Sequence, residues 1–143
     1  MRRKSFLLTL LTDFGTADYF VGAMKGVILG IAAPARIVDV THEIPPQDIE
    51  AGAFTLLNSH GSFPRETVHV AVVDPGVGSK RRAIVVRASD QYFVGPDNGL
   101  FTYIYDREIS HRVVHVGGCV HRCLDRVNRS SRTRLRRERV EDC

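Results

Sequence analysis

Short apolar runs alternate with amphipathic stretches along the first hundred residues of the chain. Four of the runs predict strands, and the first of them is continuous and bounded by polar residues, which is typical of a strand that is buried on both faces. These runs are Ser5–Thr12, Arg36–Thr41, Thr67–Asp74 and Arg82–Ala88. The YFVG stretch that starts at Tyr92 predicts one more short strand.

The segments between these runs predict helices. In the stretch Ala17–Ile31 the apolar residues recur at helical spacing; they are Phe20, Met24, Val27, Ile28 and Ile31. Asp48 is placed to cap a second helix that continues through Leu57, and a third helix is expected from near Asn98. This order of elements predicts an α/β fold with a mostly parallel central sheet flanked by helices.

Polar residues follow the predicted strands. In parallel α/β sheets, ligands bind beyond the carboxyl ends of the strands, which share one edge of the sheet. The residues at these positions are Asp13, His42 with Glu43, Asp74, and Asp97 with Asn98. They therefore predict one binding site at that edge.

Two of these aspartates each have two possible roles. Asp13, in the segment TDFG, is suited to accept hydrogen bonds from a ribose diol or to cap the following helix. Asp74, in the segment DPGVGSKRR, precedes three cations and could belong to a ligand site or to a structural ion pair. The segment is not a Walker phosphate loop, because it lacks the G-x-x-x-x-G-K-[ST] spacing.

Charge and cysteines are concentrated at the end of the chain. Residues 1–116 hold twelve basic and twelve acidic residues, whereas residues 117–143 hold eight arginines, four acidic residues and all three cysteines. We therefore expect a domain over residues 1–116 and a basic tail over 117–143 that is disordered or aberrant. The tail has no aromatic residue for base stacking, so a specific nucleic-acid partner is not expected.

Metal and membrane sites are not expected either. His42-Glu43 is not part of an H-E-x-x-H motif. A zinc site made by Cys119 and Cys123 with His115 and His121 would lack a strand or turn scaffold. No apolar run approaches the roughly 20 residues of a membrane helix, and the run Phe6–Leu11 is too short for a secretory signal, so we expect a cytoplasmic protein.

Four segments together resemble one family, in the same order. They are LLTDFGTADYFVGAMKGVI, PARIVDVTHEIPPQDIEAGAF, FPRETVHVAVVDPGVGSKRRAIVV and YFVGPDNGL. They are similar to the N-terminal domain of the S-adenosylmethionine hydrolases, or hydroxide adenosyltransferases, to which the fluorinases and chlorinases are related. The similarity covers residues from about Phe6 to about Tyr105.

The resemblance implies a reaction in which water attacks C5′ of S-adenosyl-L-methionine and yields adenosine and L-methionine. S-adenosyl-L-methionine is then a substrate, and no further cofactor is implied. By motif position, Asp74 and Arg81 are the catalytic pair that holds the water, with Arg82 as a less favoured substitute for Arg81. The halogenases have a tyrosine at the position of Asp74, which disfavours halide chemistry.

The resemblance also implies substrate contacts. Asp13 matches the ribose-binding aspartate of the family, and Gln47 stands where the fluorinases have an aromatic residue beside the sugar. Asp97 and Asn98 match a turn near the same site.

The chain departs from the family pattern after about His115. Family members form homotrimers and continue with a segment that supplies a catalytic histidine and with a C-terminal β-domain, and we find neither here. This departure suggests a reading-frame shift or a premature end. It also makes the enzyme assignment uncertain: the alternative is a truncated, catalytically inactive homologue that retains at most nucleoside binding.

Overall fold

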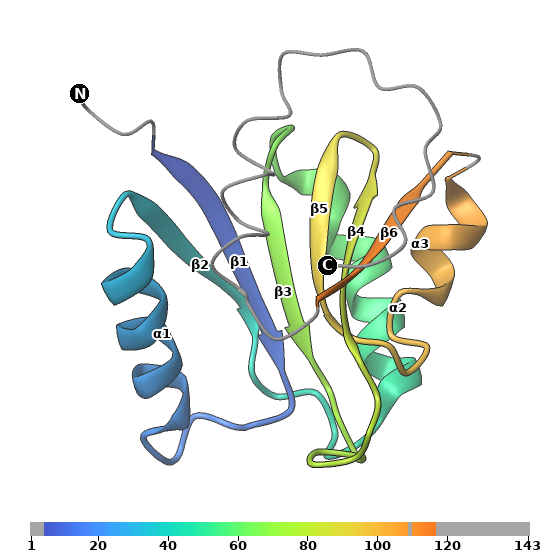
Figure 1. Ribbon diagram of the computed structural model, residues 1–143. Helices are drawn as coiled ribbons and strands as arrows, with labels where there is room; N and C mark the ends of the chain where they lie inside the picture. The colour runs from blue at the N-terminus through green and yellow to red at the C-terminus, as the bar shows by residue number, and fades with distance from the viewer. Residues whose placement is uncertain (1–4, 109, 117–143) are drawn as a thin grey trace.

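The computed structural model describes residues 5–108 and 110–116 of the chain. One six-stranded sheet has the order β2-β1-β3-β5-β4-β6 (Figure 1). The strands are β1 (Phe6–Thr12), β2 (Ala35–Thr41), β3 (Val68–Val72), β4 (Ala83–Ala88), β5 (Gln91–Pro96) and β6 (Arg112–Val116). The helices are α1 (Phe20–Ile31), α2 (Ile49–Ser59), the short 3-10 helix η1 (His60–Ser62) and α3 (Thr102–Arg107). The α/β architecture with helices flanking the sheet is as expected.

The parallel part of the sheet holds β2, β1, β3 and β5. β5 lies between β3 and β4, and β4 runs antiparallel to both β5 and β6. The amino end of β4 therefore lies beside the carboxyl end of β5, with Ala83 paired to Pro96. The loop between β3 and β4 consequently begins and ends at the same edge of the sheet (Figure 1).

Two clusters of apolar side chains hold the layers together. The larger one joins one face of the sheet to α2 and α3, and it includes Leu11, Ala71, Val73, Phe93, Leu56 and Ile104. The smaller one lies on the other face, where Leu8, Leu10 and Val68 are buried and Met24 and Ile28 of α1 pack against them. Burial of these side chains is the main stabilising contribution to the fold.

Several predicted boundaries are wrong. Helix α1 begins at Phe20 rather than Ala17, because the carboxylate of Asp18 accepts the Phe20 N–H in a side-chain turn before the helix (2.9 Å). Helix α3 begins at Thr102 rather than near Asn98, because Asn98 and Gly99 form a turn in which Gly99 has a φ of 96°. Strand β6 was not expected from the sequence at all.

No helix within residues 5–108 and 110–116 has the length and hydrophobicity that crossing a membrane requires.

Candidate active site

The predicted site residues gather at one edge of the sheet. Asp13 and Asp74 follow the carboxyl ends of the adjacent parallel strands β1 and β3, whose last residues Thr12 and Val72 are paired. Asp97 and Asn98 follow β5, and the β3–β4 loop carries Arg81 to the same edge. In Figure 1 this is the lower edge of the sheet. The topology therefore brings together side chains from three separate loops.

Asp74 and Arg81 form a salt bridge through Oδ2 and Nη2. Their side chains are 10% and 19% exposed, so most of this ion pair is shielded from water. The other carboxylate oxygen of Asp74, Oδ1, accepts the backbone N–H of Gly76 at 3.0 Å. A carboxylate held from two sides by charge-assisted bonds is fixed in orientation. Arg82, the alternative partner, is exposed and forms no ion pair with another described residue.

The β3–β4 loop is shaped around this pair. A Cβ atom at Gly76 would lie 2.6 Å from Nη1 of Arg81, so the glycine makes room for the guanidinium. The loop then turns back through a hydrogen bond from the Ser79 N–H to the Gly76 carbonyl oxygen (3.0 Å). Gly78 has a φ of 83°, in the left-handed region that favours glycine, so the shape of the loop that holds the ion pair explains both glycines of the DPGVG segment without a phosphate contact.

Asp13 is held by a residue from a different part of the chain. Its Oδ2 accepts the backbone N–H of Gln47 at 2.8 Å. Gln47 has a φ of 65°, in the left-handed region that residues with a side chain seldom adopt. The carboxylate of Asp13 is half-buried and therefore still open to a ligand on its free side.

The alternative role of Asp13 as a helix cap is excluded, because Asp18 makes the side-chain contact before α1. In contrast, Asp48 caps α2 as predicted, accepting the Ala51 N–H at 2.9 Å.

Asp97 and Asn98 connect the strand ends. The Asp97 N–H donates to the Arg82 carbonyl oxygen (2.9 Å), and the Asn98 side-chain amide donates to the Val73 carbonyl oxygen (2.9 Å). These two bonds reach both ends of the loop that carries Asp74 and Arg81. The carboxylate of Asp97 also acts at a distance: burial and then the charge of Asp97 raise the pKa of Tyr105.

Sequence reasoning placed His42 at this edge but missed its main contact. His42 is buried, and its Nδ1 lies 2.8 Å from the hydroxyl oxygen of Thr12. The signal that could have found this pair is the polar residue at the end of each of two neighbouring strands.

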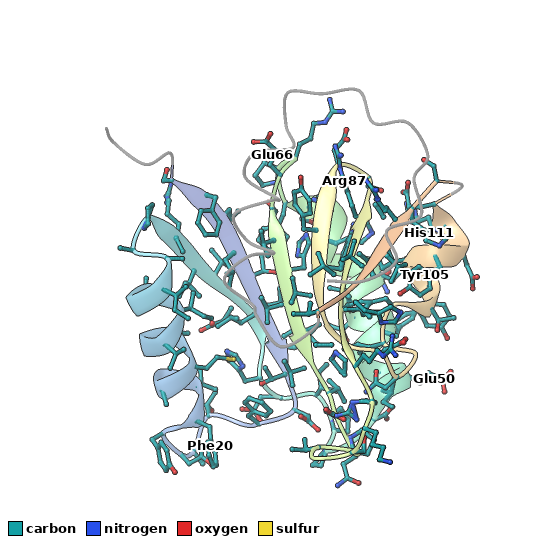
Figure 2. The ribbon with its side chains drawn as sticks, viewed as in Figure 1. Phe20, Glu50, Glu66, Arg87, Tyr105 and His111 are labelled. Carbon is teal, nitrogen blue, oxygen red and sulfur yellow. The ribbon has the colours of Figure 1, made fainter. Side chains whose placement is uncertain are left out.

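A shallow charged depression lies at the opposite edge of the sheet. Its lining residues are Arg65, Glu66, Arg87, Asp90 and Tyr92, and Figure 2 labels Glu66 and Arg87 there, at the top of the view. Asp90 pairs with Arg65 and lies 3.6 Å from Arg87, whose guanidinium also lies 5.9 Å from the centre of the Tyr92 ring. These charges pair with one another, so we assign this depression no ligand.

A metal site is not found in the described part of the chain, where no three His, Cys, Asp or Glu side chains gather in a way that could hold an ion. Three of the four residues of the zinc set considered above, Cys119, Cys123 and His121, lie outside the described residues, as does the whole basic tail 117–143.

Comparison with known proteins assigns the family. The family model described as the SAM hydroxide adenosyltransferase N-terminal domain matches residues 8–133. The chain therefore belongs to this family and corresponds to its N-terminal domain. The match extends past residue 116, and the domain boundary expected there stays a prediction.

The curated relatives are hydrolases and, more distantly, fluorinases. The chain is 49% identical over 115 residues to the (R)-S-adenosyl-L-methionine hydrolase of Methanocaldococcus jannaschii, covering 77% of this chain and 43% of that protein. It is 45% identical over 92 residues to the hydrolase of the same name from Thermus thermophilus, covering 64% and 36%. A fluorinase from Actinoplanes sp. is 28% identical over 123 residues, covering 70% and 41%. The chain thus spans less than half the length of these relatives.

Solved structures agree with the fold. An uncharacterized conserved protein from Thermotoga maritima has a TM-score of 0.75 and 38% identity, covering 77% of this chain and 43% of that one. A conserved hypothetical protein from Thermus thermophilus has a TM-score of 0.71 and 36% identity, covering 80% and 48%.

Proposed function

We propose that this chain hydrolyses S-adenosyl-L-methionine to adenosine and L-methionine, with Asp74 and Arg81 as the residues that hold the attacking water. The observation that carries the proposal is the shielded salt bridge between these two side chains, at the edge of the sheet where Asp13 also lies. Relatives named (R)-S-adenosyl-L-methionine hydrolase at 49% and 45% identity support the same reaction.

The main contribution of the protein to this reaction is to position the attacking water relative to C5′. The water oxygen forms a bond to C5′, the C5′–S bond breaks, and sulfur keeps the electron pair and leaves as a neutral thioether. One proton of the water is released. A fixed carboxylate at Asp74 accepts a hydrogen bond from the water and aims its lone pair at C5′, which lowers the entropic part of the barrier. The guanidinium of Arg81 favours the charged form of that carboxylate.

The proposed substrate contacts involve the neighbouring loops. Asp13 accepts hydrogen bonds from the ribose diol, while the Gln47 N–H keeps its carboxylate in place and the Gln47 side chain lies beside the sugar. Asp97 and Asn98 support the loop that carries Asp74 through their bonds to Arg82 and Val73.

The test is an assay of the purified chain with S-adenosyl-L-methionine, in which adenosine and methionine are separated by chromatography. We expect both products in equal amounts, and a loss of about 10²–10⁴-fold in rate for Asp74→Ala. Adenosine binding without turnover, dependent on Asp13 but not on Asp74, would instead indicate the alternative, a nucleoside-binding homologue without activity. A folded protein that forms no adenosine would overturn the hydrolase proposal.

Two adjacent arginines provide a matched control. Arg81→Ala removes the partner of Asp74 and should lower the rate by at least about tenfold. Arg82→Ala removes an exposed side chain of the same type one residue away, and the rate should stay within about twofold of wild type. Equal losses in both variants would show that only the net charge of the loop matters.

We further propose a homotrimer, and the surface of α1 supports an association of chains. No residue of this helix is buried, and Phe20, Val27 and Ile31 are 52%, 63% and 44% exposed. Figure 2 shows Phe20 at the lower end of α1. Apolar surface of this kind is typical of protein–protein contacts. Light scattering of the purified chain should give three times the monomer mass, and a monomer would contradict the proposal.

The cytoplasmic location expected from the sequence also stays a proposal, which cell fractionation would test.

A further inference from the structure

Four side chains form a continuous line of polar contacts from the surface of α1 to the loop that holds Asp13. The Lys25 Nζ donates to Oδ2 of Asp39 at 2.6 Å, and Oδ1 of Asp39 lies 3.1 Å from Nε2 of His42. On the other side of the ring, Nδ1 of His42 lies 2.8 Å from the hydroxyl oxygen of Thr12. These residues come from α1, β1 and the end of β2, which the parallel β1–β2 pairing brings together.

The direction of the hydrogen bonds is set by what each group can donate. The carboxylate of Asp39 can only accept a hydrogen bond, so the ring nitrogen that faces it, Nε2, is the one that carries the proton of a neutral His42. Nδ1 then accepts from the hydroxyl of Thr12, whose oxygen in turn accepts the backbone N–H of Phe14 at 3.2 Å. Nε2 makes no well-aligned hydrogen bond with a described residue, so its contact with Asp39 is electrostatic.

The carboxylate of Asp39 is ionised and faces the ring of His42. Burial alone would raise the pKa of Asp39, but the hydrogen bond and charge of Lys25, together with the nearby ring of His42, outweigh it and hold the pKa below its ordinary value. Thr12 and His42 are buried, whereas Asp39 and Lys25 are about one third exposed. The line of polar contacts thus runs from the partly exposed ion pair of Lys25 and Asp39 to the buried side chains beneath the candidate site.

The Asp13 loop is fastened to this line at two points. The Phe14 N–H donates to the Thr12 hydroxyl oxygen, and the Gly15 N–H donates to the His42 carbonyl oxygen at 2.7 Å. These N–H groups belong to the two peptide groups that follow Asp13, so the backbone on its carboxyl side is held. The carboxylate of Asp13 accepts a hydrogen bond from the backbone N–H of Gln47, which is 34 residues away in the sequence.

We propose that His42 is a positioning residue, which acts through Thr12 to hold the Asp13 carboxylate in the orientation that binds the ribose of the substrate. The proposal rests on the proposed function for its ligand. A histidine suits this role because it bridges two groups on opposite sides of a rigid ring, and an error of about 1 Å in the position of a binding group has large effects on turnover.

The experiment uses pairs of variants of the full chain. His42→Phe keeps the ring without its nitrogens, and His42→Asn keeps a polar atom close to the position of Nδ1. Thr12→Val removes the hydroxyl at constant size, and Thr12→Ser keeps it. This second pair of variants tests the same contact between Thr12 and His42 if His42→Phe fails to fold. His60→Phe is the matched control, because His60 is another buried histidine, bound to Gln91 at the opposite end of the sheet.

Two measurements are made on each folded variant: adenosine affinity by calorimetry, and hydrogen-exchange protection of the Gln47 and Phe14 amides by NMR. We expect His42→Phe and Thr12→Val to lose at least about tenfold in affinity and in protection of both amides, whereas His42→Asn and Thr12→Ser keep most of both. His60→Phe should change neither, even if it lowers stability. Turnover should show the loss in KM more than in kcat, since ground-state binding is affected.

Unchanged protection of Gln47 in His42→Phe and Thr12→Val would overturn the positioning role. So would wild-type adenosine affinity in these variants. If the wild-type chain itself binds no adenosine while the variants lose protection as expected, the positioning of Asp13 stands and the proposed function fails.

Discussion

The side-chain amide of Asn98 donates a hydrogen bond of 2.9 Å to the carbonyl oxygen of Val73, the residue just before Asp74. The side-chain oxygen of Asn98 also accepts the Leu100 N–H at 3.2 Å. One side chain therefore connects the end of β5 to the end of β3 and shapes the turn that leads to α3. This hydrogen bond therefore fixes the backbone position from which the side chain of Asp74 extends.

Replacing Asn98 with alanine should affect stability and activity together. Loss of the bond to a partly buried carbonyl should cost about 1–2 kcal/mol in the free energy of unfolding, measured by urea titration. Adenosine formation should fall by roughly tenfold, because the Asp74 loop loses its support. Asn58→Ala is the control: the Asn58 amide also donates to a backbone carbonyl, that of Phe54, but on the exposed face of α2. It should change stability by less than about 0.5 kcal/mol and leave activity as in wild type.

Gly95 cannot accept a side chain. A Cβ atom there would collide with the carbonyl oxygen of Ala71 and would lie 2.9 Å from the ring of Phe101. Both obstacles are in the core, so Gly95→Ala should lower the free energy of unfolding by about 2–4 kcal/mol. Gly26→Ala in α1 meets nothing within 4 Å and should instead stabilise by about 0.5–1 kcal/mol, as expected for an exposed helix interior. Similar effects of the two substitutions would contradict this account of Gly95.

Acid should destabilise the protein through His69. This histidine is fully buried, stacks on Phe93, and contacts the Thr9 hydroxyl oxygen at 2.7 Å through Nδ1. Burial, and then the charge of His60, lowers the pKa of His69 from 6.5 to about 4. Between pH 6.5 and pH 4, His69 is therefore protonated in the unfolded chain but not in the folded one. The free energy of unfolding is highest above pH 6.5 and decreases as the pH falls from 6.5 towards 4.

The expected size of the His69 effect is about 2 kcal/mol between pH 7 and pH 5, measured by urea titration at both values. His69→Phe keeps an aromatic ring in the same place and should flatten this pH dependence, although it leaves the Thr9 hydroxyl without its partner. A variant with the pH dependence of wild type would show that another group is responsible.

We expect the reaction to need no metal or further cofactor. Dialysis against a chelator should leave adenosine formation within about twofold of the untreated protein, since the proposed water is held by Asp74 and Arg81. A loss of activity that added zinc or magnesium restores would contradict this expectation and point to ligands outside the described residues.

Local patterns were sufficient for much of the sheet and its caps. The runs that predict β1, β2 and β3 agree with the structure to within two residues. For β1 and β3 the reason is that strands buried in a parallel sheet are largely apolar, whereas β2 is an edge strand with exposed residues. The cap of α2 at Asp48 was also predictable, since its hydrogen bond spans only three residues. A structural ion pair was one of the two roles that the local sequence left open for Asp74, and the choice of Arg81 over Arg82 as its partner came from the family resemblance. Their catalytic roles stay predictions.

Other features depend on which strands are neighbours. The antiparallel direction of β4 and its place beyond β5 were not predictable, because an apolar run has the same sequence signature whichever way it is paired. Helical spacing in α1 likewise predicts a stripe of five apolar residues, but only Met24 and Ile28 of that stripe pack against the sheet.

The sequence by itself determined five of the six described strands and the edge of the sheet where the candidate site residues gather. Only the tertiary structure decided the contacts of Asp13 with Gln47 and of Thr12 with His42, which join residues 34 and 30 positions apart. Contacts within one loop follow from local conformation. Contacts across such distances form only once β1 and β2 are paired, because the pairing energy must first offset the entropy of closing the chain between them.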